Sequence, residues 1–406
     1  MNSGGEIMLV QFSIKNVLSF KEETVFDMTA ISAYKEHMSN LINIGNKDKF
    51  LKVAAIYGAN ASGKSNLYFA MLYFQDIIIR SMNNYEEGQA NAIEEFYCPF
   101  SFEKNMENSE FQIVIILEGF EYRYGFEYNN KTIVAEWLYR VSLKTNRTTT
   151  IFERTEEEVL FGASVRSECA AFKNQIPSET LALSFFSKLS KLGTEVFKKV
   201  YEGIMDILIV PMNFEEDRRV LRDFLPSIID NNKTKLLEFL AAIDTGIKDI
   251  KYEDTENEIR FITFHVGRHG EKYPLNLYNE SEGTIKSVIL FIFAKIALLY
   301  DKSIFVDELN IKLHPLLLKF IIDLFYEEES QAQLIYTTHD TTLLDKKFFR
   351  RDQIWFVQKD EFGYSKLSAL SDYKVRSDAS FEKDYLAGVY GGIPFLNNDF
   401  RVKEGD

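Results

Sequence analysis

The chain has 406 residues, of which 46% are hydrophobic and 14% aromatic, so it can bury a large core and is not intrinsically disordered. Its 47 Lys and Arg stand against 61 Asp and Glu, and the formal net charge of −14 excludes nucleic-acid binding through overall charge, leaving only a local basic groove. Cys98 and Cys169 are far apart, which favours a reduced protein without disulfides or a zinc cage.

Neither a membrane segment nor a signal peptide is predicted. The longest apolar run, SVILFIFAKIALLY at 287–300, contains Lys295, and a bilayer span needs roughly 20 apolar residues. The start, MNSGGEIMLVQF, lacks a basic n-region and a cleavage site. Met8 is an alternative natural start, which would make residues 1–7 a leader. We therefore expect a cytoplasmic protein.

Taken in chain order, the first half of the sequence predicts mainly strands. Residues 9–30 alternate in part and predict two strands joined by a turn. Residues 53–58 (VAAIYG) predict a short buried strand, and residues 65–82 have the length and content of a helix. Five short strand-like runs between about 111 and 161, separated by polar turns, predict an antiparallel meander.

The second half predicts helices and then an alternation of helix and strand. Residues 178–250 carry apolar residues at helical spacing, without a heptad pattern long enough for an extended coiled coil. Residues 258–266 predict a strand, and the alternation from 281 onward predicts a parallel sheet flanked by helices. No linker is visible, so we expect one interleaved unit. Its segments are an N-terminal half (9–177), a helical lobe (178–257), a C-terminal half (258–370) and a tail (371–406).

The sequence GANASGKS (58–65) fits the phosphate-loop pattern G-x-x-x-x-G-K-[ST] and stands between the predicted strand and helix. Gly58 and Gly63 allow the backbone N–H groups to wrap around a phosphate, and the following helix adds the positive end of its dipole. Lys64 would neutralise the β- and γ-phosphates, while the Ser65 hydroxyl would bind Mg²⁺. The pattern therefore predicts an ATP site with bound magnesium.

Two later strands end in residues that suit the same chemistry. SIFVDE (303–308) places Asp307 where it would hold Mg²⁺, on a strand expected to neighbour the phosphate-loop strand, and Glu308 where it would polarise the attacking water. IYTTHD (335–340) ends a third strand in His339, which would reach the γ-phosphate from beside the DE strand.

The stretch NESEGTIKS (279–287) opens a predicted helix just before the DE strand. Ser281 is a good helix N-cap, and the apolar residues that follow at helical spacing fix the helix in the core. These are Ile285, Val288, Ile289, Ile292 and Ile296. Glu280 and Glu282 suit a phosphate site only if their side chains turn away or cap the helix, and an ordinary capped helix is the alternative.

Four motifs, taken in their order along the chain, resemble those of the ABC-class ATPases of the SMC, RecF and OLD type: GANASGKS, ESEGT, FVDELNIKLHP and TTHD. RRDQIWFVQKDEFGYSKLSALSDY and EKDYLAGVYGGIPF are similar to a bacterial group of stand-alone ATP-binding proteins that includes the ATPase subunits of the AbiL and PARIS anti-phage systems. The resemblance covers residues 9 to about 396 and is least specific over 178–257. It implies an α/β P-loop NTPase of ABC-ATPase type, with a mixed parallel sheet, an antiparallel β subdomain and a helical lobe.

The resemblance also implies roles for particular residues. Asn60, Ser62 and Asn66 would join the phosphate loop, and Ser281 and Gly283 would act as a signature that grips the γ-phosphate of ATP bound to a second subunit. LNIKLHP (309–315) would be the loop through which paired subunits sense each other. The signature departs from the usual LSGGQ, and no residue fits the glutamine that usually contacts Mg²⁺, since Gln112 is a poor candidate.

An ABC engine without a membrane span, coiled-coil arms or a nuclease domain after His339 is expected to act on a partner. The leading hypothesis is an ATP-dependent regulator or scaffold in bacterial anti-phage defence. ATP would hold two heads together, and its hydrolysis by Glu308 would release them. The effector, a nuclease, would lie on another chain. A RecF-like clamp that binds duplex DNA is the first alternative, with Arg218, Arg219 and Arg222 as its local basic candidates. A nucleotide-gated interaction module without essential turnover is the second.

Overall fold

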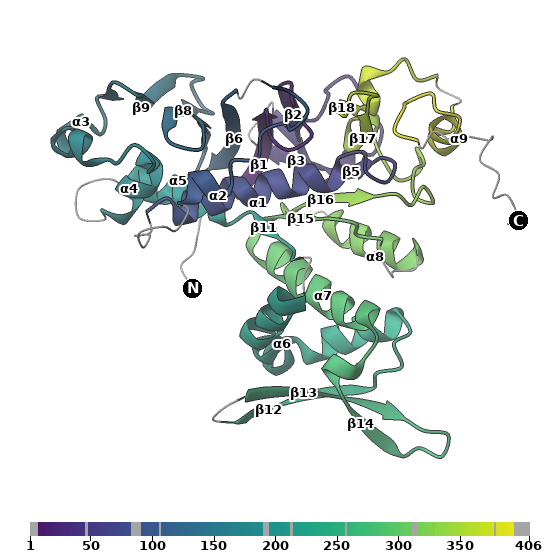
Figure 1. The fold of residues 1–406 in the computed structure, drawn as a ribbon. Coiled ribbons are helices and arrows are strands. Elements are labelled where there is room, and N and C mark those ends of the chain that lie inside the picture. Colours follow the sequence, from purple (N-terminus) through teal and green to yellow (C-terminus); the bar gives the residue numbers. More distant parts are fainter. Residues whose placement is uncertain are drawn as a thin grey trace, which may run out of the picture.

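The computed structural model describes ten stretches of the chain, which form two large sheets with a smaller lobe below them (Figure 1). The described residues are 7–44, 48–82, 91–104, 107–189, 195–211, 214–255, 258–310, 315–327, 329–376 and 379–393.

A six-stranded sheet forms the centre of the molecule, with its strands in the order β11-β15-β16-β5-β17-β18. From one edge to the other these are Leu208–Ile209, Ser303–Val306, Gln333–Thr338, Val53–Tyr57, Ile354–Lys359 and Ser365–Ala369. The first five are parallel and β18 is antiparallel to β17. The order confirms the interleaving of the two halves, because β5 lies between strands of the C-terminal half.

One expectation about this sheet is wrong. The DE strand β15 does not neighbour the phosphate-loop strand β5, because β16, the strand that leads to His339, lies between them. All three strands are buried along their whole length, as expected for parallel strands covered on both faces. Their carboxyl ends therefore meet at one edge of the sheet with β16 in the middle.

The two faces of this sheet belong to two different cores. On one face, Ala54 and Ile56 of β5 pack with α1 (Lys64–Arg80), α4 (Ala182–Lys188) and α5 (Glu195–Met205). On the other face, Val53 and Tyr57 pack with the second set of helices. These are α6 (Phe214–Ala242), α7 (Glu282–Tyr300), α8 (Pro315–Phe325) and α9 (Phe381–Leu386). The helices within 178–257 are thus shared between the two cores.

A seven-stranded antiparallel sheet lies on the other side of α1, with the order β10-β9-β8-β7-β6-β1-β2. Its strands are Val159–Phe161, Thr148–Thr155, Ile133–Ser142, Phe120–Tyr128, Ser109–Leu117, Ile7–Lys15 and Thr24–Asp27. The predicted five-strand meander and the N-terminal strand pair are both confirmed. Helix α1 runs between this sheet and the parallel one (Figure 1), and its buried residues join the same core as the strands.

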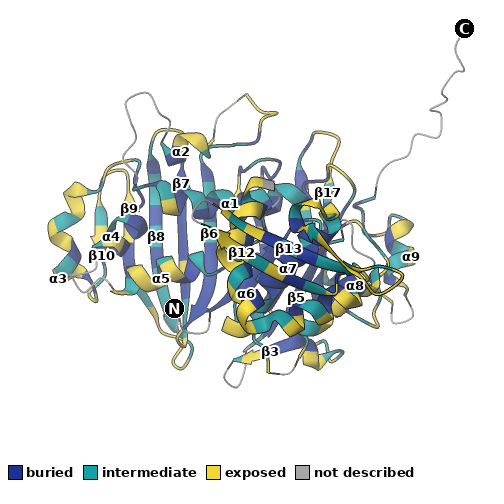
Figure 2. Cartoon of the chain, turned by 90° about the horizontal axis from the view of Figure 1, so that it is seen from below, coloured by how far each residue is buried: buried dark blue, intermediate teal, exposed yellow. Residues whose placement is uncertain are grey.

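The lower lobe is built on α6 and α7, which pack against a three-stranded sheet. That sheet contains β12 (Asp249–Thr255), β13 (Glu258–Val266) and β14 (Lys272–Asn276). Seen from below, β12 and β13 carry exposed residues along their outer side (Figure 2). Strands β11, β12, β14, β17 and β18 are among those that lie outside the elements that the sequence pattern predicts. The remaining elements are β3 (Leu41–Ile44), β4 (Asp48–Leu51), α2 (Ala92–Glu95) and α3 (Arg166–Cys169).

Helix α7 connects the lobe to the central sheet. It contains the apolar run noted in the sequence, and Ile285, Val288, Ile289 and Ile292 are buried as the spacing predicts. Among the helices of the described residues, it is the one with the length and apolar content of a membrane span, at 19 residues. Since 56% of that stretch is buried inside the protein, its burial is that of a core helix.

Candidate nucleotide-binding site

The loop GANASGKS turns from β5 into α1, and its glycines are required by space and by backbone geometry. A Cβ atom on Gly58 would lie 2.5 Å from the carbonyl oxygen of Val357, and one on Gly63 would lie 2.3 Å from the Ser365 hydroxyl. Gly63 also has a φ of 112° and precedes the first residue of α1. The loop is therefore held closely against β17 and β18 at the carboxyl edge of the sheet.

Lys64 is the cation of this loop, and it is 95% buried, with a relative exposure of 5%. Its ammonium donates to the carbonyl oxygens of Gly58 at 2.8 Å and Ala59 at 3.0 Å. Burial lowers the pKa of Lys64, and the negative charges of Glu308 and Asp307 act in the opposite direction. The structure thus brings the phosphate-loop lysine and both acids of the DE strand into one electrostatic environment.

Thr337, on the middle strand β16, links the two acids to each other. Its hydroxyl donates to Oδ1 of Asp307 and accepts the backbone N–H of Glu308 at 2.7 Å. Thr337 is fully buried, and Glu308 adopts a left-handed backbone with a φ of 50° just beyond the end of β15. The sequence shows Thr337 only as one of several polar residues before His339, so local pattern gives no signal for this role.

The residues present fit a magnesium ion. Asp307 is buried, and its second carboxylate oxygen, Oδ2, has no hydrogen-bond partner among the described residues. An unpartnered buried carboxylate oxygen is costly unless a cation binds it. Ser65, at the start of α1, offers a hydroxyl, and an all-oxygen set of this kind suits Mg²⁺. Asp307 and Ser65 are the residues that would hold the ion.

His339 follows β16 directly and contacts the residue two positions after Glu308. Its Nε2 lies 3.3 Å from the Asn310 side-chain nitrogen, and Oδ1 of Asn310 accepts from the Thr338 hydroxyl at 2.8 Å. Asn310 therefore links the histidine strand to the beginning of the predicted subunit-sensing loop. Residues 311–314 of that loop lie outside the described residues.

The other predicted phosphate-loop residues have different surroundings. Asn60 is exposed, whereas Ser62 is buried and its hydroxyl has no partner among the described residues. The side chain of Asn66 donates to the Ser19 hydroxyl at 2.7 Å, so it fixes the loop to the turn after β1. Ser365 donates to the Ser62 carbonyl oxygen at 2.7 Å, and its hydroxyl lies 2.7 Å from that of Ser19. Ser19 and Ser365 hold the loop, and no sequence motif marks either.

A cavity of about 600 Å³ adjoins this anchor. Ser19 and Asn66 line it on the loop side, and aromatic and polar residues line the rest. The others include Tyr97, Cys98, Phe100, Phe102, Glu103 and Lys359. Sites for small molecules and cofactors are lined mainly by apolar and aromatic side chains with a few polar groups, as this cavity is. Because it adjoins the residues that hold the phosphate loop, the cavity is a candidate for the nucleoside part of a nucleotide.

The predicted signature turn is the N-terminus of α7. The exposed Ser281 accepts the Thr284 backbone N–H at 3.1 Å, so it is the helix N-cap, and Gly283 is partly buried. Glu280 turns toward β13, where its carboxylate accepts from the Thr263 hydroxyl and contacts Nε2 of His265 at 2.8 Å. These contacts hold the Glu280 carboxylate away from the N-terminus of α7.

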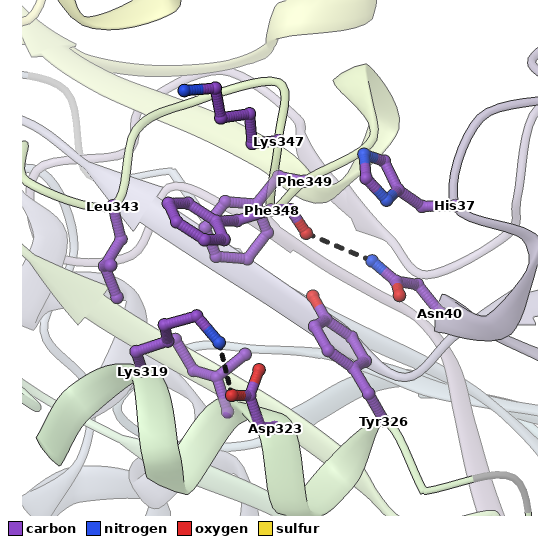
Figure 3. Close-up of a pocket in the computed structure, with 10 residues that line it drawn as sticks. His37, Asn40, Lys319, Asp323, Tyr326, Leu343, Lys347, Phe348 and Phe349 are labelled. Atoms are coloured by element: carbon purple, nitrogen blue, oxygen red, sulfur yellow. Dashed lines mark hydrogen bonds and ion pairs between the residues drawn. The ribbon is translucent and has the colours of Figure 1, made fainter. Parts of the chain in front are cut away.

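Two further sequence observations can be placed. Gln112 accepts from the Trp137 indole at 3.0 Å within the antiparallel sheet, which agrees with leaving it out of the ATP site. A separate cavity of about 250 Å³ lies between α8 and the loop after β16 (Figure 3). Lys319 pairs with Asp323 there, and Asn40 donates to the Phe348 carbonyl oxygen at 3.2 Å. None of its lining residues belongs to the predicted nucleotide set.

The fold and this site define a P-loop ATPase of ABC type: a mixed α/β sheet, an antiparallel β subdomain and no long coiled coil in the described part of the chain. Residues 53–345 match the family described as "AAA domain, putative AbiEii toxin, Type IV TA system". Because the match covers more than half of the chain, the protein belongs to this family.

Solved structures similar to the chain include three SMC heads. One is an SMC head bound to the C-terminal winged-helix domain of ScpA, with 18% identity, a TM-score of 0.45, and coverage of 92% of this chain and 99% of that one. The second is the SMC head domain of Thermotoga maritima, with 12% identity, a TM-score of 0.40, and coverage of 89% of this chain and 98% of that one. The third is an SMC head with an extended coiled coil bound to the C-terminal domain of ScpA, derived from Pyrococcus furiosus. It has 16% identity, a TM-score of 0.44, and coverage of 95% of this chain and 100% of that one. No curated protein matches the chain.

Proposed function

We propose that the protein binds and hydrolyses ATP with Mg²⁺ at the edge formed by Lys64, Asp307 and Glu308. Lys64 exchanges its loop carbonyls for the β- and γ-phosphates, since a charged phosphate oxygen is the stronger acceptor. Glu308, oriented through Thr337, accepts a proton from the attacking water. Mg²⁺ at Asp307 and Ser65 would neutralise charge that develops on the phosphates.

The observation that carries this proposal is the convergence of three distant segments of the chain. The phosphate loop, the DE strand and the histidine strand meet at one sheet edge, and both acids act on the charge of Lys64. A glycine turn alone, or an acidic strand end alone, has ordinary structural explanations. Their meeting around a buried lysine and an unpartnered Asp307 oxygen is what a phosphate and a cation require.

We further propose that the site is completed by a second copy of the chain. Ser281 lies at the end of α7 that is farther from β15, and a 19-residue helix is about 28 Å long. The helix starts at the exposed Ser281, and the N–H groups in the first turn of a helix attract anions. A homodimer with two sandwiched ATP molecules would bring each Ser281 turn onto the partner's phosphate loop.

The proposed biological role is a regulator or scaffold for a separate effector, a nuclease, in bacterial anti-phage defence. The description of the matched family names a toxin of a type IV toxin–antitoxin system, which supports a role of this kind. The resemblance to the AbiL and PARIS ATPase subunits is the reason for the finer proposal. No cluster of three or more His, Cys, Asp or Glu residues suited to a metal occurs in the described residues.

Direct duplex-DNA binding is not favoured by the surroundings of its candidate arginines. Arg218 lies over the Tyr278 ring at 4.6 Å, and Arg222 pairs with Asp223 at 3.0 Å. Both arginines follow the acidic first turn of α6, with Glu215, Glu216 and Asp217. Neighbouring acids offset the positive charge that a phosphate backbone needs.

The proposal is tested by ATP binding and turnover of the full chain with Mg²⁺. Lys64→Ala should weaken ATP binding on the order of 100-fold or more, because it removes a charge-assisted contact to two phosphates. Glu308→Gln should bind ATP as the wild type does but lose turnover on the order of 100-fold, and its mass with ATP should be that of a dimer. Turnover by Glu308→Gln at the wild-type rate would show that the assignment of Glu308 is wrong.

A further inference from the structure

The C-terminal segment (residues 379–393) lies beyond the part of the chain that matches the family, and the proposed function gives it no role. It contains α9 and then three glycines with left-handed backbones: Gly388, Gly391 and Gly392, with φ of 78°, 69° and 70°. Such a run of positive φ values fixes a specific path that other residues rarely adopt. The path leads to the phosphate loop.

Two tyrosines attach the segment to the strand beside that loop. The rings of Tyr385 and Tyr390 each lie 5.3 Å from the ring of Phe356 on β17, nearly parallel to it. The ring of Tyr385 is also 6.2 Å from that of Tyr57, the residue that precedes Gly58. Both tyrosines are buried. Aromatic contacts of this kind add to the energy of burial, so the segment is firmly packed.

The glycine turn then meets the first residue of the phosphate loop. A Cβ atom on Gly392 would lie 3.6 Å from the Cα atom of Gly58 and 3.4 Å from the Val357 carbonyl oxygen. The Tyr385 hydroxyl donates to the carbonyl oxygen of Gly392 at 2.9 Å, which fixes the turn in this place. Gly58 is thus confined between β17 and the glycine turn.

A second contact joins the same segment to the histidine strand. The hydroxyl of Thr341, two residues after His339, donates to Oε1 of Glu382 at 3.2 Å. Glu382 lies in the first turn of α9, three residues before Tyr385. The C-terminal segment therefore touches the start of the phosphate loop through Gly392 and the turn after His339 through Glu382.

We propose that the C-terminal segment is a positioning element of the ATP site, in which Tyr385 acts through Gly392 on the phosphate loop and Glu382 acts through Thr341 on the turn after His339. This inference rests on the proposed ATPase function. The two contacts have separable effects, because the phosphate loop sets the affinity for ATP, whereas the turn after His339 bears on the step at the γ-phosphate.

The experiment measures the affinity of the full chain for a fluorescent ATP analogue, the KM and kcat for ATP, and the melting temperature. Tyr385→Phe keeps both rings in place and should weaken binding about three- to tenfold, as expected for one lost hydrogen bond. Gly392→Ala should weaken it more than about tenfold, because its backbone is left-handed and the methyl group would face the phosphate loop. Thr341→Val should lower kcat about three- to tenfold with KM within about twofold.

Leu386→Ala is the matched control, since Leu386 adjoins Tyr385 in α9 and is 59% exposed. It should leave affinity, KM and kcat unchanged. A lower melting temperature for Tyr385→Phe and Gly392→Ala, with wild-type affinity and kcat, would overturn the inference and leave only a structural role. A wild-type chain that binds no ATP would instead overturn the proposed function, and the inference with it.

Discussion

The two parts of the proposed ATP site are built in different ways. The sheet edge, with Lys64, Asp307 and Glu308, assembles residues more than 200 positions apart in the sequence, and it is largely buried. The signature turn, with Ser281 and Gly283, is a local helix cap whose hydrogen bond spans three residues, and Ser281 is exposed. The difference teaches that the residues of the sheet edge come together within one chain, whereas the exposed turn would act, in the proposed dimer, on the phosphate loop of a second copy.

The sheet edge and the signature turn also differ in how their charges are balanced. At the sheet edge, burial lowers the pKa of Lys64, and the negative charges of Glu308 and Asp307 oppose that shift. At the signature turn, Glu280 is held by Thr263 and His265, and the positive end of the α7 dipole is left facing outward. The dipole therefore favours an anion at the turn, whereas the charge of the exposed Glu282 in the first turn of α7 opposes it.

The largest expected effect comes from removing the metal ligand at the sheet edge. Asp307→Asn preserves the shape of the side chain but removes the charge, so ATP turnover should fall on the order of 100-fold or more. Added Mn²⁺ should recover less than a tenth of the wild-type rate, measured as phosphate release. Turnover within about twofold of the wild type would place the metal ligand elsewhere.

The next effect tests whether the signature turn acts on another chain. Ser281→Asp retains a good N-cap but adds a negative charge, so the melting temperature should hold while turnover falls on the order of 30-fold. ATP binding by the isolated chain should stay at the wild-type level. Ser281→Asn is the matched control, because it caps the helix equally well without the charge, and it should lose less than about fivefold.

Mixing two inactive variants sharpens this test. Lys64→Ala supplies an intact signature turn, and Ser281→Asp supplies an intact phosphate loop, so each mixed dimer contains one complete site. An equal mixture should recover about a quarter of the wild-type rate, since half of the dimers are mixed and each has one of two sites. If mixed dimers form, as judged by mass, and recover nothing, the completion of the site in trans is wrong.

A smaller effect is expected from the threonine between the two acids. Thr337→Val keeps the shape but removes both hydrogen bonds, so Glu308 and Asp307 lose their orientation and kcat should fall about tenfold. The affinity for ATP should change little, because Lys64 keeps its loop. An equal loss in kcat for Thr338→Val, whose hydroxyl bonds to Asn310, would show that the effect is not specific to the acids.

The smallest effect belongs to the contact that holds Glu280. His265→Ala removes one of its two partners while Thr263 remains, so turnover should fall only about two- to threefold, with ATP affinity unchanged. His269 is exposed in the connection between β13 and β14, and His269→Ala is the matched control. A loss of ATP affinity in His265→Ala would contradict the separation of the two parts.

Sequence alone predicts the elements whose signals are local. The loop GANASGKS, the strand ends at Asp307 and His339 and the Ser281 cap each lie within a few residues of the pattern that marks them, and each element forms as expected. The order of the strands has no such local signal, because the pairing of β16 with its two neighbours depends on the whole sheet. The expectation that β15 lies next to β5 failed for this reason.

The supporting residues escape sequence analysis for the same reason. Ser19 and Ser365 are 346 positions apart and meet only because β18 returns to the phosphate loop. Strand β11 has two residues, too few for a periodic signal, although it extends the sheet beside β15. The helices within 178–257 give a clear periodicity, yet nothing in it shows that α4 and α5 pack in one core and α6 in the other.

The contacts of Lys64 with the carbonyl oxygens of Gly58 and Ala59 have a consequence for selectivity. Two carbonyl oxygens of the loop accept hydrogen bonds from the Lys64 ammonium group, which weakens its attraction for other anions. A weakly charged anion gains little by displacing two good acceptors, whereas a polyphosphate replaces both at once. We therefore expect the loop to select molecules by how many strong acceptors they present together, before any base or sugar is recognised.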